Sequence, residues 1–119
     1  MSYEKSKEKY LKQTQICSET DYAEKNSVRK RNSAVSEMYR IVNSIAERND
    51  QVEILNFADL LNIEENRTNI WAAVQILEKL DVDNKTEHQA LEIIKKAACG
   101  VDPDALGFQL WLENYVKKE

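Results

Sequence analysis

The sequence predicts an all-α protein of about six helices, arranged in antiparallel pairs that stack into a short array. Three observations lead to this prediction. The 119 residues include only two glycines and one proline, no segment alternates apolar and polar residues as a half-buried strand does, and apolar residues recur three and four positions apart. The connections between the periodic segments are a few residues long, which favours antiparallel neighbours.

Length and composition fit one domain, residues 1–119. With 42% hydrophobic and 32% charged residues, the chain can bury a modest core and lacks the composition of a disordered protein. No apolar run approaches the roughly 18 residues that span a membrane. The start, MSYEKSKEKY, carries charge where a secretory signal is apolar. We therefore expect a cytoplasmic protein with an N-terminal amphipathic helix in residues 1–24 and a helical core in residues 25–119.

Three helices are expected in the first half of the chain. The first, over about residues 3–22, has a narrow apolar stripe, and the second, over about residues 25–48, has a wider one. The third is expected to begin after Asn49 or Asp50, either of which can cap it, and to end near Asn62. The two stripes consist of Tyr3, Tyr10, Leu11, Thr14 and Cys17 in the first helix and Val28, Val35, Met38, Val42 and Ile45 in the second.

The fourth helix contains the most apolar segment of the chain. It enters from a polar turn and runs through Leu80, and three residues near that turn can cap its first amides: Asn66, Thr68 and Asn69. Its stretch RTNIWAAVQIL, residues 67–77, is apolar on more than one face. We interpret this stretch as a central helix with neighbours on both sides, and we place Trp71 in the core.

Two further helices complete the chain. Thr86 begins a capping-box pattern, and Gly100 stands where a left-handed residue would end the fifth helix. Asp102 and Pro103 form an N-cap followed by a proline at the first helical position, where its missing N–H costs nothing. The sixth helix is again apolar on more than one face, and we interpret its Trp111 as a core residue.

Residues that could support catalysis or bind a metal are scarce. His88 is the only histidine, and we expect it to be exposed in the first turn of the fifth helix, without a paired nucleophile. Cys17 and Cys99 have no further ligands at metal-binding spacing, so we interpret both as reduced, half-buried packing residues, with a regulatory disulfide as the alternative. The two glycines form no phosphate-binding loop. We therefore expect no enzymatic activity, no metal and no cofactor.

Several blocks of residues resemble known helical proteins. The run over residues 69–77 resembles the second half of a HEAT or armadillo repeat, in which an alanine pair and a leucine pack on the neighbouring helices. Three blocks in order resemble a small bacterial domain of unknown function with an armadillo-like fold. They are Arg31-Asn32 leading into Met38-Tyr39, Trp71-Ala72-Ala73 through Leu77, and Ala90-Leu91 through Gly107-Phe108, Leu112 and Tyr115. The resemblance covers roughly residues 28–118 and implies a short armadillo/HEAT-like array.

Acidic residues are concentrated in the second part of the chain. Residues 51–119 contain 13 acidic and 7 basic residues, whereas residues 1–50 contain 8 and 10. Pairs of carboxylates occur at the expected helix ends, where they can cap helices or can form one acidic edge that attracts a basic partner. The candidate partner-binding residues are Glu64, Glu65, Asp81, Asp83, Asp102 and Asp104.

These observations favour a non-catalytic protein-binding module. Small acidic helical-repeat proteins resemble immunity proteins, so the concrete hypothesis is a bacterial immunity protein that binds and blocks a basic, nuclease-type toxin. The alternative is a nucleic-acid-binding helical repeat that uses Arg29, Lys30 and Arg31, although the net charge of −4 and the lack of nearby aromatic residues disfavour it. An enzyme would require His88 to meet a carboxylate and a hydroxyl in a cleft. Nothing in the sequence indicates a membrane partner or an oligomeric state.

Overall fold

The computed structural model of the chain describes residues 3–100 and 105–118, which contain six α-helices and no strand. The all-α prediction is therefore confirmed for the described residues. No helix among them is long and apolar enough to cross a membrane. The elements are α1 Tyr3–Ser18, α2 Lys25–Arg48, α3 Gln51–Phe57, the 3-10 helices η1 Ala58–Asn62 and η2 Glu65–Arg67, α4 Thr68–Lys79, α5 Asn84–Ala98 and α6 Ala105–Lys118.

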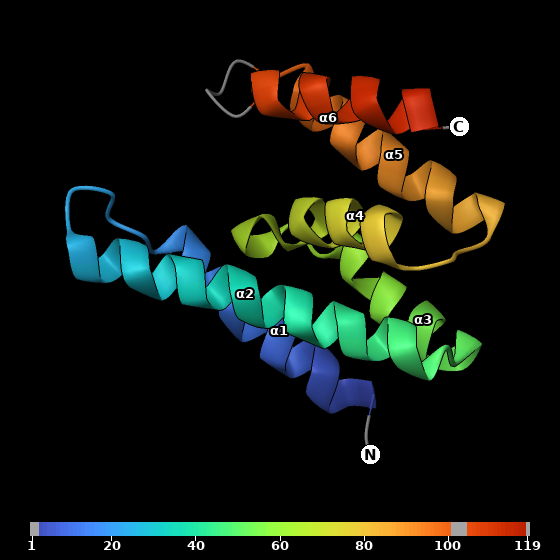
Figure 1. The fold of residues 1–119 in the computed structure, drawn as a ribbon, viewed down its shortest axis with the longest axis horizontal. Helices are drawn as coiled ribbons and strands as arrows, with labels where there is room; N and C mark the ends of the chain where they lie inside the picture. Colours follow the sequence, from blue (N-terminus) through green and yellow to red (C-terminus); the bar gives the residue numbers. More distant parts are fainter. Residues whose placement is uncertain (1–2, 101–104, 119) are drawn as a thin grey trace.

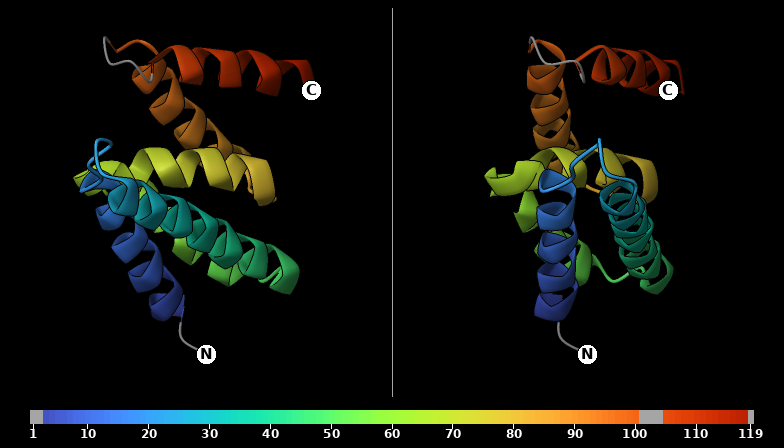
Figure 2. Two further views of the ribbon diagram at one scale, coloured as in Figure 1. Left: turned by 60° about the vertical axis from the view of Figure 1, so that its left-hand side comes forward. Right: turned by 90° about the vertical axis from the view of Figure 1, so that its left-hand side faces the viewer.

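The helices form a stack in which sequence neighbours are also neighbours in space. α1 packs on α2, α4 packs on α5, and α5 packs on α6 (Figure 1). α4 also contacts α2, which joins the N-terminal pair to the rest of the stack. Figure 2 shows the start of α1 and the end of α6 at opposite ends of the molecule. The predicted stacked array of antiparallel pairs is confirmed.

One hydrophobic core runs through the stack and includes the N-terminal helix. Tyr10 of α1 is fully buried, and its ring meets that of Phe57 edge to face at 5.0 Å between centroids. Thr14, one turn further along α1, is also fully buried, and its hydroxyl lies 2.8 Å from that of Thr68. The core comprises Tyr10, Met38, Ile41, Val42, Ile45, Ile54, Phe57, Leu60, Leu61, Ala72, Ala73, Ile76, Leu80, Ala90 and Ile94.

The boundary between α2 and α3 follows from two adjacent polar residues. Asn49 ends α2 in the left-handed conformation, with φ of 49°, and its N–H donates to the Ile45 carbonyl. Asp50 then caps α3 by accepting from the N–H of Val52 at 2.9 Å. Asparagine tolerates positive φ better than most residues, and aspartate is a preferred N-cap. The predicted start of the third helix is therefore confirmed, with Asp50 as its cap.

Two predictions about α5 are wrong. The helix begins at Asn84, because the Asp83 carboxylate caps it by accepting from the Thr86 N–H at 2.8 Å. Thr86 is thus the third residue of the helix and does not start a capping box. No described glycine has positive φ, so Gly100 does not end α5 in the left-handed conformation. The predicted boundary at residues 102–103 lies outside the described residues.

The entrance of α4 also differs from the prediction. Arg67 occupies the N-cap position with no side-chain cap, so none of the three expected residues is the N-cap. The Asn69 side chain does accept from a first-turn amide, the N–H of Ile70, at 3.0 Å. Asn66 and Arg67 are both left-handed, with φ of 57° and 59°. The hydroxyl of Thr68 instead donates to the Glu65 carbonyl at 2.8 Å. A left-handed arginine is conformationally costly, so packing around this turn must hold it in place.

Candidate binding pocket

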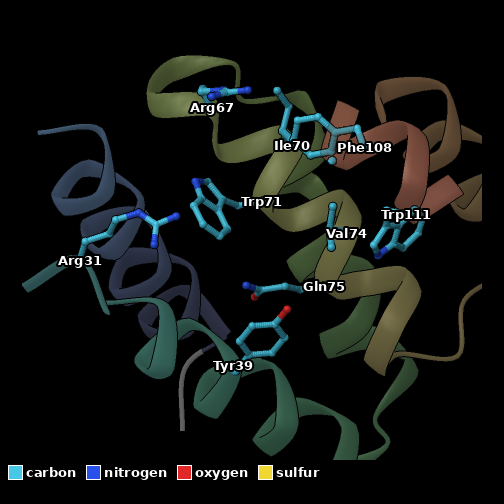
Figure 3. A pocket seen from close by; sticks show the side chains of 10 residues that line it. Arg31, Tyr39, Arg67, Ile70, Trp71, Val74, Gln75, Phe108 and Trp111 are labelled. Carbon is cyan, nitrogen blue, oxygen red and sulfur yellow. The ribbon is translucent and has the colours of Figure 1, made fainter. Parts of the chain in front are cut away.

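A pocket of about 440 Å³ opens between α2, α4 and α6 (Figure 3). α4 forms its floor, α2 one wall and α6 the other, and Arg67 stands at one end. Most of the lining is apolar or aromatic. The lining residues are Arg31, Tyr39, Arg67, Ile70, Trp71, Val74, Gln75, Gly107, Phe108 and Trp111.

The two apolar faces of α4 have different roles. Ala72, Ala73 and Ile76 are fully buried and pack in the core. Ile70 and Val74 are only partly buried and line the pocket. The expectation of neighbours on both sides holds, since α4 contacts both α2 and α5. The second face of α4, however, is not wholly covered by these neighbours.

Both tryptophans of the chain line this pocket. Trp71 comes from the floor and Trp111 from the α6 wall, and each is partly buried. The Trp111 ring is stacked on Tyr115, with centroids 5.1 Å apart and planes inclined by 13°. Their interpretation as core residues needs correction, because each packs against the core on one side and borders the pocket on the other.

Arg31 is the residue of the basic triplet whose side chain lines the pocket. Its guanidinium carbon lies 5.7 Å from the centroid of the Trp71 ring and 5.9 Å from that of Tyr22, within the range of cation–π attraction. Arg29 and Lys30 are exposed. Neither Tyr22 nor Trp71 is adjacent to the triplet along the chain, so the sequence alone does not place an aromatic ring beside it. The cation–π contacts of Arg31 therefore separate it from the two cations before it.

Gln75 brings a buried polar group to the pocket floor. Its side chain is 1% exposed, and Oε1 accepts a hydrogen bond from the Tyr10 hydroxyl at 2.8 Å. Its Nε2 has no hydrogen-bond partner in the described part of the chain. A buried donor without a partner costs about 1–3 kcal/mol. The signal in the sequence is this single amide within an otherwise apolar run, and the prediction of a central apolar helix does not account for it.

Tyr39 of α2 presents a neutral hydroxyl beside the pocket. It donates to Glu78 Oε1 at 2.9 Å. Burial, together with this hydrogen bond, raises the pKa of Tyr39 to about 12. The phenol therefore stays protonated at neutral pH. None of the ten lining residues carries a carboxylate, whereas Arg31 and Arg67 each carry a cation.

The predicted acidic residues do not share one edge of the molecule. Glu64 and Glu65 are exposed before α4, whereas Asp81 and Asp83 are exposed after it. The 12 residues of α4 place these pairs about 18 Å apart along the helix axis. The expected single acidic edge is therefore wrong for these two pairs, because successive connections in a stack of antiparallel helices lie at opposite ends. Asp102 and Asp104 lie outside the described residues, and a role for any of the six in binding stays a prediction.

The residues considered for chemistry do not line the pocket. His88 is exposed as the fifth residue of α5, just after the first turn in which it was expected. Both cysteines are free thiols, but only Cys17 is half-buried; Cys99 is exposed, which corrects its interpretation as a packing residue. Burial raises the pKa of Cys17, while nearby Arg31 partly offsets that rise. The described residues contain no cluster of three or more side chains suited to a metal ion.

Comparisons with known protein families, with curated proteins and with solved structures find no match for this chain. The resemblance to a small bacterial armadillo-like domain stays a prediction.

Proposed function

We propose that this chain is a non-catalytic binding module that holds a partner protein against α6 and the adjoining pocket. The observation that supports it is the exposure of apolar residues on α6. Leu106 is 63% exposed and Leu110 is 53% exposed. Neighbouring exposed apolar residues on a soluble protein are a feature of interaction sites.

The geometry of α6 connects these leucines to the pocket. Leu106 and Leu110 are one helical turn apart and therefore lie in one row on the helix surface. Gly107 and Trp111 form the next row, and both line the pocket. The helix thus offers a partner two adjacent rows, one open and one leading into the cavity. Tryptophan at the centre of such a surface is a frequent anchor of protein binding.

The more specific form of this proposal is a cytoplasmic bacterial immunity protein that blocks a basic, nuclease-type toxin. Its support is the net charge of −4 and the exposure of Glu64, Glu65, Asp81 and Asp83. Carboxylates that occupy the positions of substrate phosphates would attract a basic toxin and cover its working surface. Because the two pairs lie at opposite ends of α4, the toxin would have to extend along that helix or use one pair only.

A site-specific photo-crosslinker tests the binding surface. Placed at Leu110 in the native cells, it is expected to yield an adduct with one other protein; placed at Val52, which is 64% exposed on α3, it is expected to yield none. The identified partner, once purified, should bind Leu110→Asp at least about tenfold more weakly than the parent chain, which corresponds to about 1.4 kcal/mol. Val52→Asp should bind it normally. Adducts with a second copy alone, or equal binding by Leu110→Asp, would contradict the proposal.

Charge reversal tests the immunity form separately. If the partner is a basic toxin, binding should weaken as salt rises, and Glu64→Lys with Glu65→Lys, or Asp81→Lys, should lower both affinity and protection of cells. Glu92→Lys is a matched control, since Glu92 is exposed on α5 and pairs only with the nearby Lys95 among the described salt bridges. Unchanged protection by all the reversed variants would eliminate the acidic contact.

A further inference from the structure

We propose that the pocket between α2, α4 and α6 binds a small organic anion, in which an anionic group is carried on a flat apolar body. The size of the pocket fits such a molecule. Its volume of about 440 Å³ lies within the range of small-molecule sites. Its lining of apolar and aromatic side chains with few polar groups is also typical of such sites.

The polar groups that face this space are matched to a negative charge. Arg31 has no salt bridge within the described part of the chain, and its guanidinium lies over the Trp71 ring. A cation–π contact does not use the N–H donors of a guanidinium, and these donors can bind an anion through two hydrogen bonds. Arg67 adds a second cation at one end of the pocket, and no lining residue is acidic.

Gln75 supplies an independent indication of a ligand. Figure 3 shows its amide end between the rings of Trp71 and Tyr39, on the side that faces Arg31. The Tyr10 hydroxyl holds Oε1, so the unpartnered Nε2 is available to donate. Buried donors are nearly always satisfied in folded proteins. An anion held by Arg31 would give Nε2 the acceptor that the chain itself does not provide.

The aromatic side chains that line the pocket favour a flat apolar body as the other part of the ligand. Trp71, Phe108 and Trp111 border the pocket from its floor and from α6. Aromatic rings offer large flat apolar surfaces that favour offset stacking on a planar ligand. The expected occupant therefore has a planar ring system beside its carboxylate, sulfonate or phosphate group. This inference does not depend on a partner protein, since it concerns the inner row of α6 and the floor of α4.

Two dyes with nearly the same apolar body provide the test. Anilinonaphthalene sulfonate carries an anion, and phenylnaphthylamine is its neutral counterpart. Both should bind the full-length chain, and energy transfer from tryptophan reports on the pocket because both tryptophans line it. Arg31→Gln should weaken binding of the sulfonate about tenfold, as expected for loss of a charged hydrogen bond of about 1.4 kcal/mol, and should leave the neutral dye unaffected.

Two further variants complete the design. Arg29→Gln removes the same charge from an exposed position two residues earlier and should leave the affinity for both dyes within about twofold. Gln75→Glu keeps an acceptor for Tyr10 but replaces the donor with a negative oxygen, so it should weaken the sulfonate selectively. Circular dichroism establishes whether this variant folds, and the Arg31 and Arg29 pair decides the question if it does not.

Three results would overturn the proposal. Equal losses for Arg29→Gln and Arg31→Gln would mean that the sulfonate senses only the general surface charge. Equal losses of both dyes with Arg31→Gln would mean that the anionic group is not recognised. Displacement of the sulfonate by inorganic phosphate at an equal concentration would mean that the apolar body contributes nothing. Failure of this test leaves the crosslinking test at Leu110 unaffected, so the two proposals are separable.

Discussion

The Tyr10 hydroxyl donates a hydrogen bond of 2.8 Å to Gln75 Oε1, across 65 positions of the chain. The bond joins α1 to α4, and both side chains are buried. It has two consequences. The N-terminal helix, which the sequence presents as a narrow amphipathic segment, is part of the central core. The bond also fixes the Gln75 amide so that its other end faces the pocket.

Replacing Tyr10 with phenylalanine should destabilise the fold. Gln75 Oε1 would lose the donor that it has among the described residues and would remain buried, so the free energy of unfolding should fall by about 1–3 kcal/mol. Chemical denaturation followed by circular dichroism measures the change. Tyr22→Phe is the control, because Tyr22 is exposed and its hydroxyl makes no hydrogen bond within the described residues. Equal stability of the two variants would show that the bond contributes nothing.

Tyr10 should also make the free energy of unfolding depend on pH in the alkaline range. Burial raises the pKa of Tyr10 well above its ordinary value of 10.0. The unfolded chain then loses this proton before the folded chain does, so the stabilisation is complete below pH 10 and is lost as pH rises through the folded pKa. Tyr39, whose pKa burial raises to about 12, adds to the loss between pH 10 and about 12.

Unfolding free energies measured from about pH 8 to about pH 12 test this prediction. The parent chain should lose stability more steeply above pH 10 than Tyr10→Phe does, while Tyr10→Phe should keep the part of the slope that belongs to Tyr39. Identical slopes for the parent and the variant would mean that Tyr10 is equally accessible to base in both states.

Loss of the ion pair between Arg48 and Glu53 should also destabilise the fold. Arg48 Nε and Nη2 each donate to a Glu53 carboxylate oxygen at 2.8 Å, and the Glu53 side chain is only 4% exposed. Arg48→Met leaves a buried carboxylate without its guanidinium, so unfolding free energy should fall by about 2–4 kcal/mol; the value is moderated because Arg48 is partly exposed. The double variant Arg48→Met with Glu53→Met should recover part of this loss, since neither charge is then left buried.

A double-mutant cycle measured by chemical denaturation gives the coupling between the two residues. Glu37→Gln is the matched control, because Glu37 forms an ion pair with Arg40 on the exposed surface of α2. Its loss should be much smaller, as expected for a solvent-screened pair. A double variant less stable than Arg48→Met alone would contradict this prediction, because the unpaired Glu53 carboxylate would then cost less than a methionine at the same position.

Helical periodicity predicted the described elements and much of the core. Met38, Val42 and Ile45 follow the expected spacing on α2, and all three are fully buried. The narrow stripe on α1 correctly contained Tyr10 and Thr14, both of which are also fully buried. Periodicity succeeds here because a helix buries one face, and the spacing of that face is set by the backbone alone.

Helical periodicity did not predict the exact helix ends or the pocket. Asp83 and Thr86 both have side chains that can cap a helix, and α5 begins after the earlier of the two, Asp83. The contact between Arg31 and Trp71 depends on how α2 crosses α4, which no local spacing encodes. Likewise, the sequence predicts that both apolar faces of α4 are buried. Because α2 and α6 are separated, part of the second face lines the pocket instead. Local rules therefore locate helices better than they locate the space between them.

The Asp83 carboxylate caps α5, so a change at Asp83 can affect the fold as well as partner binding. Hydrogen bonds with the Thr86 hydroxyl and then with its backbone N–H lower the pKa of Asp83 below its ordinary value of 3.8. Its stabilisation is therefore present above pH 3.8 and is lost as pH falls through the folded pKa. Asp83→Ala should lower the melting temperature and remove this acid dependence, whereas Asp83→Asn should retain the cap without the acid dependence.

Thermal melts between about pH 2 and about pH 7 separate these variants. Asp81→Ala is the control, because Asp81 is exposed and precedes the helix without capping it. If Asp83→Ala melts like Asp81→Ala, the cap does not stabilise α5. If it melts lower, as expected, then reversing the charge of Asp83 would damage the fold as well as any binding surface. Asp81 is then the residue in this connection whose reversal reports on partner binding alone.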